Sequence, residues 1–129
     1  LLEATEGSLW AGIAAARPSN HLVDISQAVE AYVVQRGFSV VREYTGHGVG
    51  RQMHAAPQVL NYVPAGAGKG PRLKPGMTFA LEPMVNVGTW RTKGLTDGWT
   101  VVTVDGKRSA HFEHSIALTD GEPEILTVL

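Results

Sequence analysis

Apolar side chains recur at helical spacing in the first part of the chain, at Leu2, Leu9, Trp10, Ile13 and Ala14. This spacing predicts a helix over residues 2–16, which the run Arg17-Pro18-Ser19-Asn20 ends. A second helix follows, capped by Asn20 or Asp24 and ended by Gly37. Its predicted buried face comprises Val23, Ile25, Ala28, Val29, Tyr32 and Val33. Because the two helices are adjacent in sequence, we expect them to pack as neighbours.

From Phe38 onward the pattern changes to short stretches that are typical of strands. We predict a strand over residues 38–44, a glycine-rich loop over 45–50 and a surface loop over 64–76. Further strands are predicted over 78–87, with a break at Pro83, and over 125–128. Residues 100–104 and 109–118 flank Asp105-Gly106, which predicts a hairpin. Two helices followed by antiparallel strands indicate an α+β fold with the helices on one face of a curved sheet.

Composition limits the function classes. The chain has 129 residues, which fits a single domain over 1–129, and 43% hydrophobic with 18% charged residues is ordinary for a globular protein. A net charge of −1 gives no attraction to nucleic acid or an anionic membrane. The absence of cysteine excludes disulfides, thiolate metal sites and a cysteine nucleophile. Without a signal peptide or a membrane-length apolar run, we expect a soluble cytoplasmic protein.

Two candidate metal ligands come from a loop and a strand. His47 lies between Gly46 and Gly48, which leave space around its ring, although a turn with an incidental histidine is the alternative. In a strand, Glu82 shares a face with the small residues Thr78 and Ala80. A buried glutamate there needs a partner, whereas an exposed edge glutamate does not.

Glu113 is the third candidate. Strand alternation places it on one face with His111 and Ser115, opposite an apolar face, although a solvent-exposed polar face produces the same pattern. One imidazole and two carboxylates together offer the nitrogen and oxygen donors that suit Mn, Fe, Co or Zn. Since His47, Glu82 and Glu113 are far apart in sequence, only the tertiary fold could gather them.

Other residues are weaker candidates. His54 could approach the same cavity as His47 or lie on the surface. Tyr44, Met53 and Trp99 could line an apolar pocket, although such residues are more often part of a core. The serines lack the context of a nucleophile elbow, and the glycines around His47 lack the ending of a phosphate-binding loop. These observations disfavour a nucleophilic triad and argue against a nucleotide-phosphate site.

Several motifs occur in a specific order: Gly46-His47-Gly48-Val49-Gly50-Arg51, Met53-His54, Ala56-Pro57-Gln58-Val59-Leu60, Lys74-Pro75-Gly76-Met77-Thr78-Phe79, Glu82-Pro83-Met84 and Phe112-Glu113-His114. In this order the chain resembles the bacterial-type, or type I, methionine aminopeptidases through essentially its whole length. The resemblance implies the C-terminal part of a catalytic domain with the pita-bread fold. It also implies removal of the initiator methionine by attack of a water that two divalent ions, such as Co, Mn, Fe or Zn, activate.

The resemblance also implies roles for individual residues. His47, Glu82 and Glu113 match metal ligands of the family, with Glu113 bridging two ions and Glu82 as the better candidate for carrying the proton. His54 matches a histidine that contacts the substrate and stabilises the reacting peptide.

The resemblance places Tyr44, Met53 and Trp99 at the methionine pocket and its approaches. Met53 replaces an aromatic residue there, and His111 stands where other members often have a neutral polar residue. Both departures bear on the shape of the pocket and leave the reaction class unchanged.

The family site also uses two aspartates and a second substrate histidine that precede the matched segment. None of Asp24, Asp97, Asp105 and Asp120 lies in the right context to replace those aspartates. The chain also opens on Leu1, without methionine and inside a predicted helix, so we expect a fragment, a processed form or a structure lacking earlier residues. We expect the N-terminal portion to supply the aspartates and the segment alone to have little or no activity. The implied partners are the N-terminal methionine of nascent polypeptides and the ribosome.

Two alternatives remain at this stage. A related pita-bread peptidase, such as an Xaa-Pro dipeptidase, is disfavoured by Arg51, where those relatives usually have a histidine-rich continuation. A metal-free pita-bread binding module is disfavoured because His47, Glu82 and Glu113 are all retained.

Overall fold

The computed structural model describes residues 1–128 and contains two helices and ten short strands in that range. The helices are α1 (Leu2–Ala15) and α2 (Leu22–Val34). The strands are β1 (Ser39–Val40), β2 (Gly46–Gly48), β3 (Ala55–Val59), β4 (Thr78–Leu81), β5 (Met84–Asn86), β6 (Thr92–Gly94), β7 (Val101–Thr103), β8 (Ser109–His111), β9 (His114–Ala117) and β10 (Glu124–Ile125). Within this range neither helix has the length and apolar character needed to cross a bilayer.

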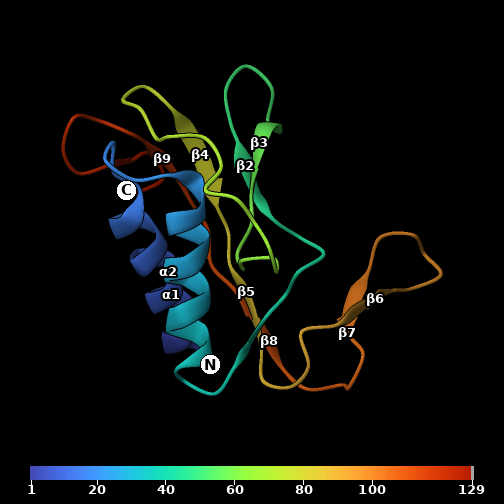
Figure 1. The fold of residues 1–129 in the computed structure, drawn as a ribbon. Coiled ribbons are helices and arrows are strands. Elements are labelled where there is room, and N and C mark those ends of the chain that lie inside the picture. The colour runs from blue at the N-terminus through green and yellow to red at the C-terminus, as the bar shows by residue number, and fades with distance from the viewer. Residues whose placement is uncertain (129) are drawn as a thin grey trace.

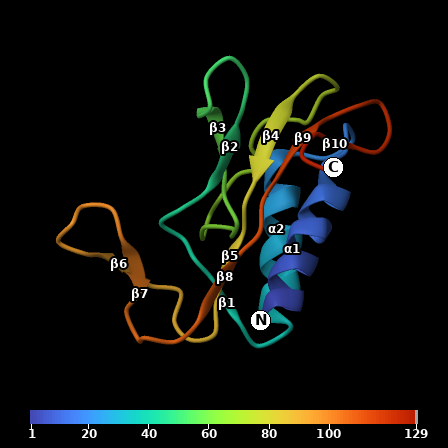
Figure 2. The ribbon, with the colours of Figure 1, turned by 180° about the vertical axis from the view of Figure 1, so that it is seen from behind.

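Both predicted helices are present and pack side by side, as Figures 1 and 2 show. The cap of α2 differs from the prediction: His21 is the N-cap residue, and its backbone N–H donates to Asp24 Oδ2 at 2.7 Å. Asn20 instead donates from Nδ2 to the carbonyl of Ala15 and satisfies the end of α1. Gly37 follows α2 with φ of 78°, a conformation that favours glycine.

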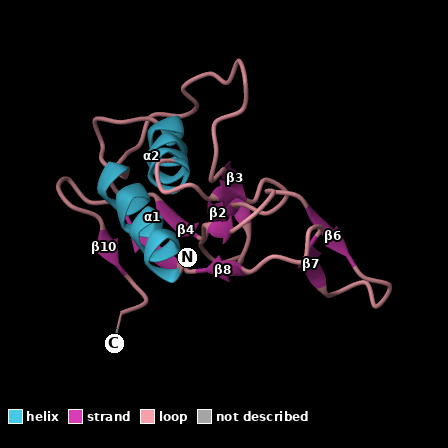
Figure 3. Cartoon of the chain, turned by 90° about the horizontal axis from the view of Figure 1, so that it is seen from below, coloured by secondary structure: helices cyan, strands magenta, loops and turns pink. Residues whose placement is uncertain are grey.

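The strands form antiparallel sheets in the orders β10-β9-β4-β2-β3, β1-β5-β8 and β6-β7. Leu9 and Ile13 of α1 pack on Phe79, Leu81 and Ile116 in the main core cluster. The helices therefore cover one face of the largest sheet, and the predicted α+β class is confirmed (Figure 3). The β6-β7 ribbon stands apart from this body in Figures 1 and 3.

The hairpin predicted across Asp105-Gly106 is wrong. Strand β7 pairs with β6, and β8 pairs with β5. The dipeptide still makes a turn, with Gly106 at φ of 70°, but the Asp105 side chain accepts hydrogen bonds from the N–H groups of Thr89 and Lys107. The turn therefore returns the chain from the β6-β7 ribbon to the body, a connection that local turn chemistry cannot distinguish from a hairpin.

The predicted strand boundaries are partly wrong as well. The loop predicted over 45–50 contains β2, because pairing with β3 and β4 on both sides makes it a central strand. Of the strand predicted over 38–44, only β1 forms. In place of the strand predicted over 125–128, the described residues contain the shorter strand β10, which begins one residue earlier. Strands β3 and β6 were not predicted, whereas the break at Pro83 is confirmed by the separation of β4 from β5.

Candidate metal centre

A paired break in two neighbouring strands creates the site. Strand β4 pairs with β9 through Leu81 and His114, and β5 pairs with β8 through Met84 and His111. The same register, carried through the gap between these pairs, places Glu82 opposite Glu113. Like charges that face each other across strands repel, so this arrangement needs a compensating cation or proton.

The backbone around Glu82 is held from two sides. The buried Asn61 side chain donates to the Glu82 carbonyl at 3.3 Å, and Phe112 N–H donates to the Pro83 carbonyl at 3.4 Å. Pro83 itself lacks a donor and ends β4 at this point. The break in the ladder is therefore fixed in place.

His47 reaches Glu82 from the adjacent strand β2. It pairs with Ala80, which lies two residues before Glu82, and its Nε2 is 3.2 Å from Glu82 Oε1. Its Nδ1 is 2.8 Å from the Gly48 carbonyl oxygen. Because a carbonyl only accepts, this contact requires the hydrogen on Nδ1 and leaves the Nε2 lone pair for a metal ion.

Two more histidines stand around this pair. The His54 ring packs against the His47 ring with 4.3 Å between centroids. His111 Nε2 lies 3.7 Å from Glu82 Oε2. Glu82, His111 and Glu113 each offer a ligand atom within 4.8 Å of the others. The structure thus brings His47, His54, Glu82 and Glu113 together, with His111 beside them, and their roles as ligands and substrate contacts stay predictions.

The electrostatics of Glu82 favour a bound cation or proton. Burial raises the pKa of the Glu82 carboxyl above its ordinary value, and the nearby Glu113 carboxylate raises it further. His47, His111 and His54 act in the opposite direction but do not cancel these effects. A divalent ion between the carboxylates would remove the repulsion, and imidazole with carboxylate is a donor set that suits Mn, Fe, Co or Zn. The residues present therefore fit a metal.

The three predicted pocket residues, Tyr44, Met53 and Trp99, do not form one cluster in the structure. Tyr44 lines a cavity of about 340 Å³ beside the site, together with Val41, Met84 and His111. Met53 and Trp99 are 74% and 89% exposed and extend into solvent. Their predicted contact with a methionine side chain stays a prediction.

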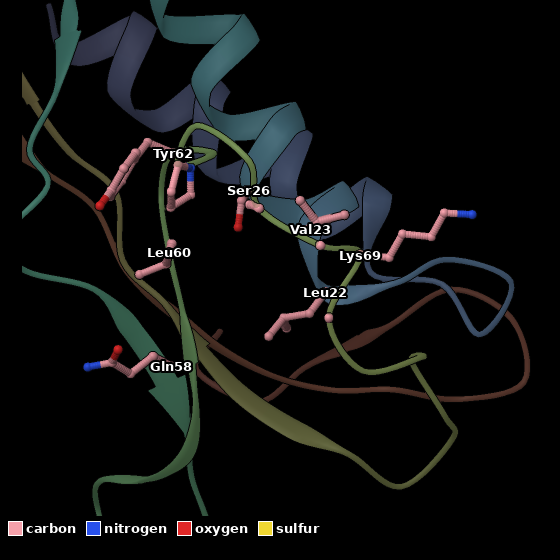
Figure 4. A pocket seen from close by; sticks show the side chains of 11 residues that line it. Leu22, Val23, Ser26, Gln58, Leu60, Tyr62 and Lys69 are labelled. Carbon is pink, nitrogen blue, oxygen red and sulfur yellow. The ribbon is translucent and has the colours of Figure 1, made fainter.

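A second cavity, shown in Figure 4, lies between the start of α2 and the loop that follows β3. Its volume is about 150 Å³, and its lining includes Leu22, Val23, Leu60 and Tyr62. Lys69 is its only charged lining residue and points away from the cavity in Figure 4. The lining contains hydroxyl groups from Ser26 and Tyr62 but no histidine, cysteine or carboxylate, so the cluster around Glu82 remains the candidate metal centre.

Sequence reasoning missed His111 as part of the cluster. Alternation had already placed it on the same face as Glu113, and that was the available signal. What the sequence did not contain was the register of β5 against β8, which sets how close His111 comes to Glu82.

Comparison with known proteins supports this interpretation. The chain is 57% identical over 127 residues to methionine aminopeptidase 1 of Bacillus subtilis (strain 168), which covers 98% of this chain and 50% of that protein. The crystal structure of methionine aminopeptidase from Thermotoga maritima superposes with a TM-score of 0.94 at 46% identity, covering 100% of this chain and 51% of that one. For the enzyme from Rickettsia prowazekii the TM-score is 0.93 at 44% identity, covering 99% and 51%.

These matches confirm the predicted resemblance and the predicted portion of the pita-bread fold. The chain spans about half the length of the relatives that it matches. The model of metallopeptidase family M24 matches residues 1–120, a range that contains every residue of the candidate metal centre. With its metal-compatible cluster and this match, the chain belongs to metallopeptidase family M24.

Proposed function

We propose that these 129 residues are the C-terminal part of the catalytic domain of a methionine aminopeptidase, and that the whole protein removes the N-terminal methionine from nascent polypeptides. The observation that carries the proposal is the placement of Glu82 opposite Glu113, with His47 Nε2 at 3.2 Å from Glu82. The relatives at 57% and 50% identity are methionine aminopeptidases, which favours this activity over that of an Xaa-Pro peptidase.

Three residues would hold the metal. His47 presents Nε2, Glu82 and Glu113 present carboxylate oxygens, and Glu113 is the proposed bridge between two divalent ions of Co, Mn, Fe or Zn. When bound, such ions supply Lewis acidity and a water nucleophile at neutral pH. The two aspartates that complete the charge balance would come from an N-terminal portion of the protein.

Glu82 and His54 are the proposed catalytic residues. Burial and Glu113 raise the Glu82 pKa, so this carboxyl is able to accept a proton and to release it during the reaction. The His54 ring packs against the His47 ring with 4.3 Å between centroids, and its proposed role is to donate a hydrogen bond to the substrate carbonyl. Tyr44, Met53 and Trp99 are proposed to contact the methionine side chain. Nascent chains as substrates imply the cytoplasm as location and the ribosome as partner.

The test uses the full-length protein loaded with Co²⁺ or Mn²⁺. We expect cleavage of Met-Ala-Ser faster than release of the first residue from Ala-Pro substrates, with loss of activity on chelation. The 129-residue chain alone should have little or no activity, because it lacks the aspartates. Faster cleavage of Ala-Pro substrates would favour an Xaa-Pro peptidase. Absence of both metal and cleavage in the full-length protein would contradict every enzymatic interpretation and leave the binding module.

A further inference from the structure

His111 occupies a place at the metal centre that the family resemblance does not explain. It is the last residue of β8, pairs with Met84 across to β5, and lies two residues before Glu113. The resemblance implies a neutral polar residue at this position. Here an imidazole is present, 45% exposed, with Nε2 at 3.7 Å from Glu82 Oε2.

The two oxygens of Glu82 face different imidazoles. Oε1 is 3.2 Å from His47 Nε2, and Oε2 is 3.7 Å from His111 Nε2. The carboxylate therefore has a nitrogen donor on each side, and Glu113 stands across from it. Two imidazoles, from His47 and His111, and two carboxylates, from Glu82 and Glu113, therefore lie together in this chain.

The distances fit coordination after a small movement. Ligand atoms bound to one ion at roughly 2.1 Å each lie at most about 4.2 Å apart. Glu82, His111 and Glu113 have ligand atoms within 4.8 Å of one another, and the His111 side chain is 45% exposed. An ion between Glu82 and Glu113 would thus find an imidazole nitrogen within reach.

We infer that His111 is a metal ligand of this protein, bound on the side of Glu82 that His47 does not reach. The inference rests on one part of the proposed function, namely that a transition metal binds between Glu82 and Glu113. It adds a second imidazole to the ligands that the resemblance supplies. Nitrogen donors bind Co²⁺ and Zn²⁺ more strongly than a neutral amide oxygen does, so the metal should be held more tightly than with glutamine at this position.

The test compares His111→Gln with wild type and with His114→Gln in the full-length protein. His114 is a matched control, because it follows Glu113 directly but bonds through Nδ1 to the Thr127 hydroxyl at 2.7 Å and packs on Trp10. The proteins are loaded with Zn²⁺ or Co²⁺. X-ray absorption counts the imidazoles at the metal, and competition with a chelator gives the affinity.

We expect His111→Gln to lower the imidazole count by one per protein and to weaken binding more than about tenfold, while His114→Gln matches wild type. An unchanged count with weaker binding would overturn the inference, since His111 would then only hydrogen-bond to Glu82. An unchanged count with unchanged binding would overturn it and leave the proposed function intact. Failure of wild type to bind metal would overturn both. If His111→Gln does not fold, His111→Ala provides the same comparison.

Discussion

Gly46 and Gly48, the two glycines beside His47, allow β2 to lie close to its neighbouring strands. Adding a single methyl group at one of them should disturb this packing and the position of His47. A Cβ at Gly46 would overlap the carbonyl oxygen of Ala80 in β4 and would lie 3.3 Å from Val59 in β3. Strand β2 lies between those two strands, so it has no free side toward which it could move. Gly46→Ala therefore has to be accommodated by displacing backbone rather than a flexible side chain.

The expected cost follows from two opposing effects. Overpacking in an enclosed site costs about 1–3 kcal/mol, and replacing glycine returns about 0.4–1 kcal/mol through the unfolded chain. The net loss is about 0–2.6 kcal/mol, which lowers the Tm of a domain of this size by up to roughly 10 °C. His47, the next residue, moves with the strand, so the affinity for Co²⁺ or Zn²⁺ should fall in the same variant.

The matched control is Gly50→Ala. Gly50 has no atom within 4 Å of the added Cβ and no positive φ, so only the unfolded-state effect applies and stability should stay equal or rise slightly. Thermal melts of both variants, followed by circular dichroism in the presence of a chelator, measure the difference. If Gly46→Ala melts at or above the temperature of Gly50→Ala, the close approach of strands does not explain the glycine.

Further predictions concern Glu82 and the β6-β7 ribbon. Because the folded-state pKa of Glu82 is raised, its contribution to the stability of the metal-free protein is present below the ordinary glutamate pKa and is lost as pH rises through the raised value. Denaturant titrations from pH 4 upward should show this decline, and Glu82→Gln should reduce it; an equal decline in both proteins contradicts the assignment. Arg42 stands between the Tyr62 and Trp90 rings, with its guanidinium carbon 5.0 and 4.7 Å from their centroids. Arg42→Leu should therefore increase hydrogen exchange in the β6-β7 ribbon. Arg91→Leu, which removes a contact to Trp90 alone, should have a smaller effect; equal exchange in the two variants would exclude Arg42 as the link.

Local patterns predicted the elements whose burial follows directly from the sequence. The two helices and the break at Pro83 depend on interactions between residues close in the chain. The strands around Glu82 and Glu113 were visible in the local alternation of side chains, although their pairing joins distant segments. The prediction failed where a strand depends on distant partners. Gly46 to Gly48 looks like a loop until β3 and β4 supply hydrogen bonds on both sides, and Asp105-Gly106 looks like a hairpin until the chain around it pairs elsewhere.

The sequence by itself determined the helices, the strand faces, and, through ordered motifs, the resemblance that predicts His47, Glu82 and Glu113 as ligands. Only the tertiary structure decided how these donors meet. The register of β4 on β9 and of β5 on β8 places Glu82 opposite Glu113. The same register brings His111 to the second oxygen of Glu82. The physical reason is that register is a property of paired strands, so no single stretch of residues contains it.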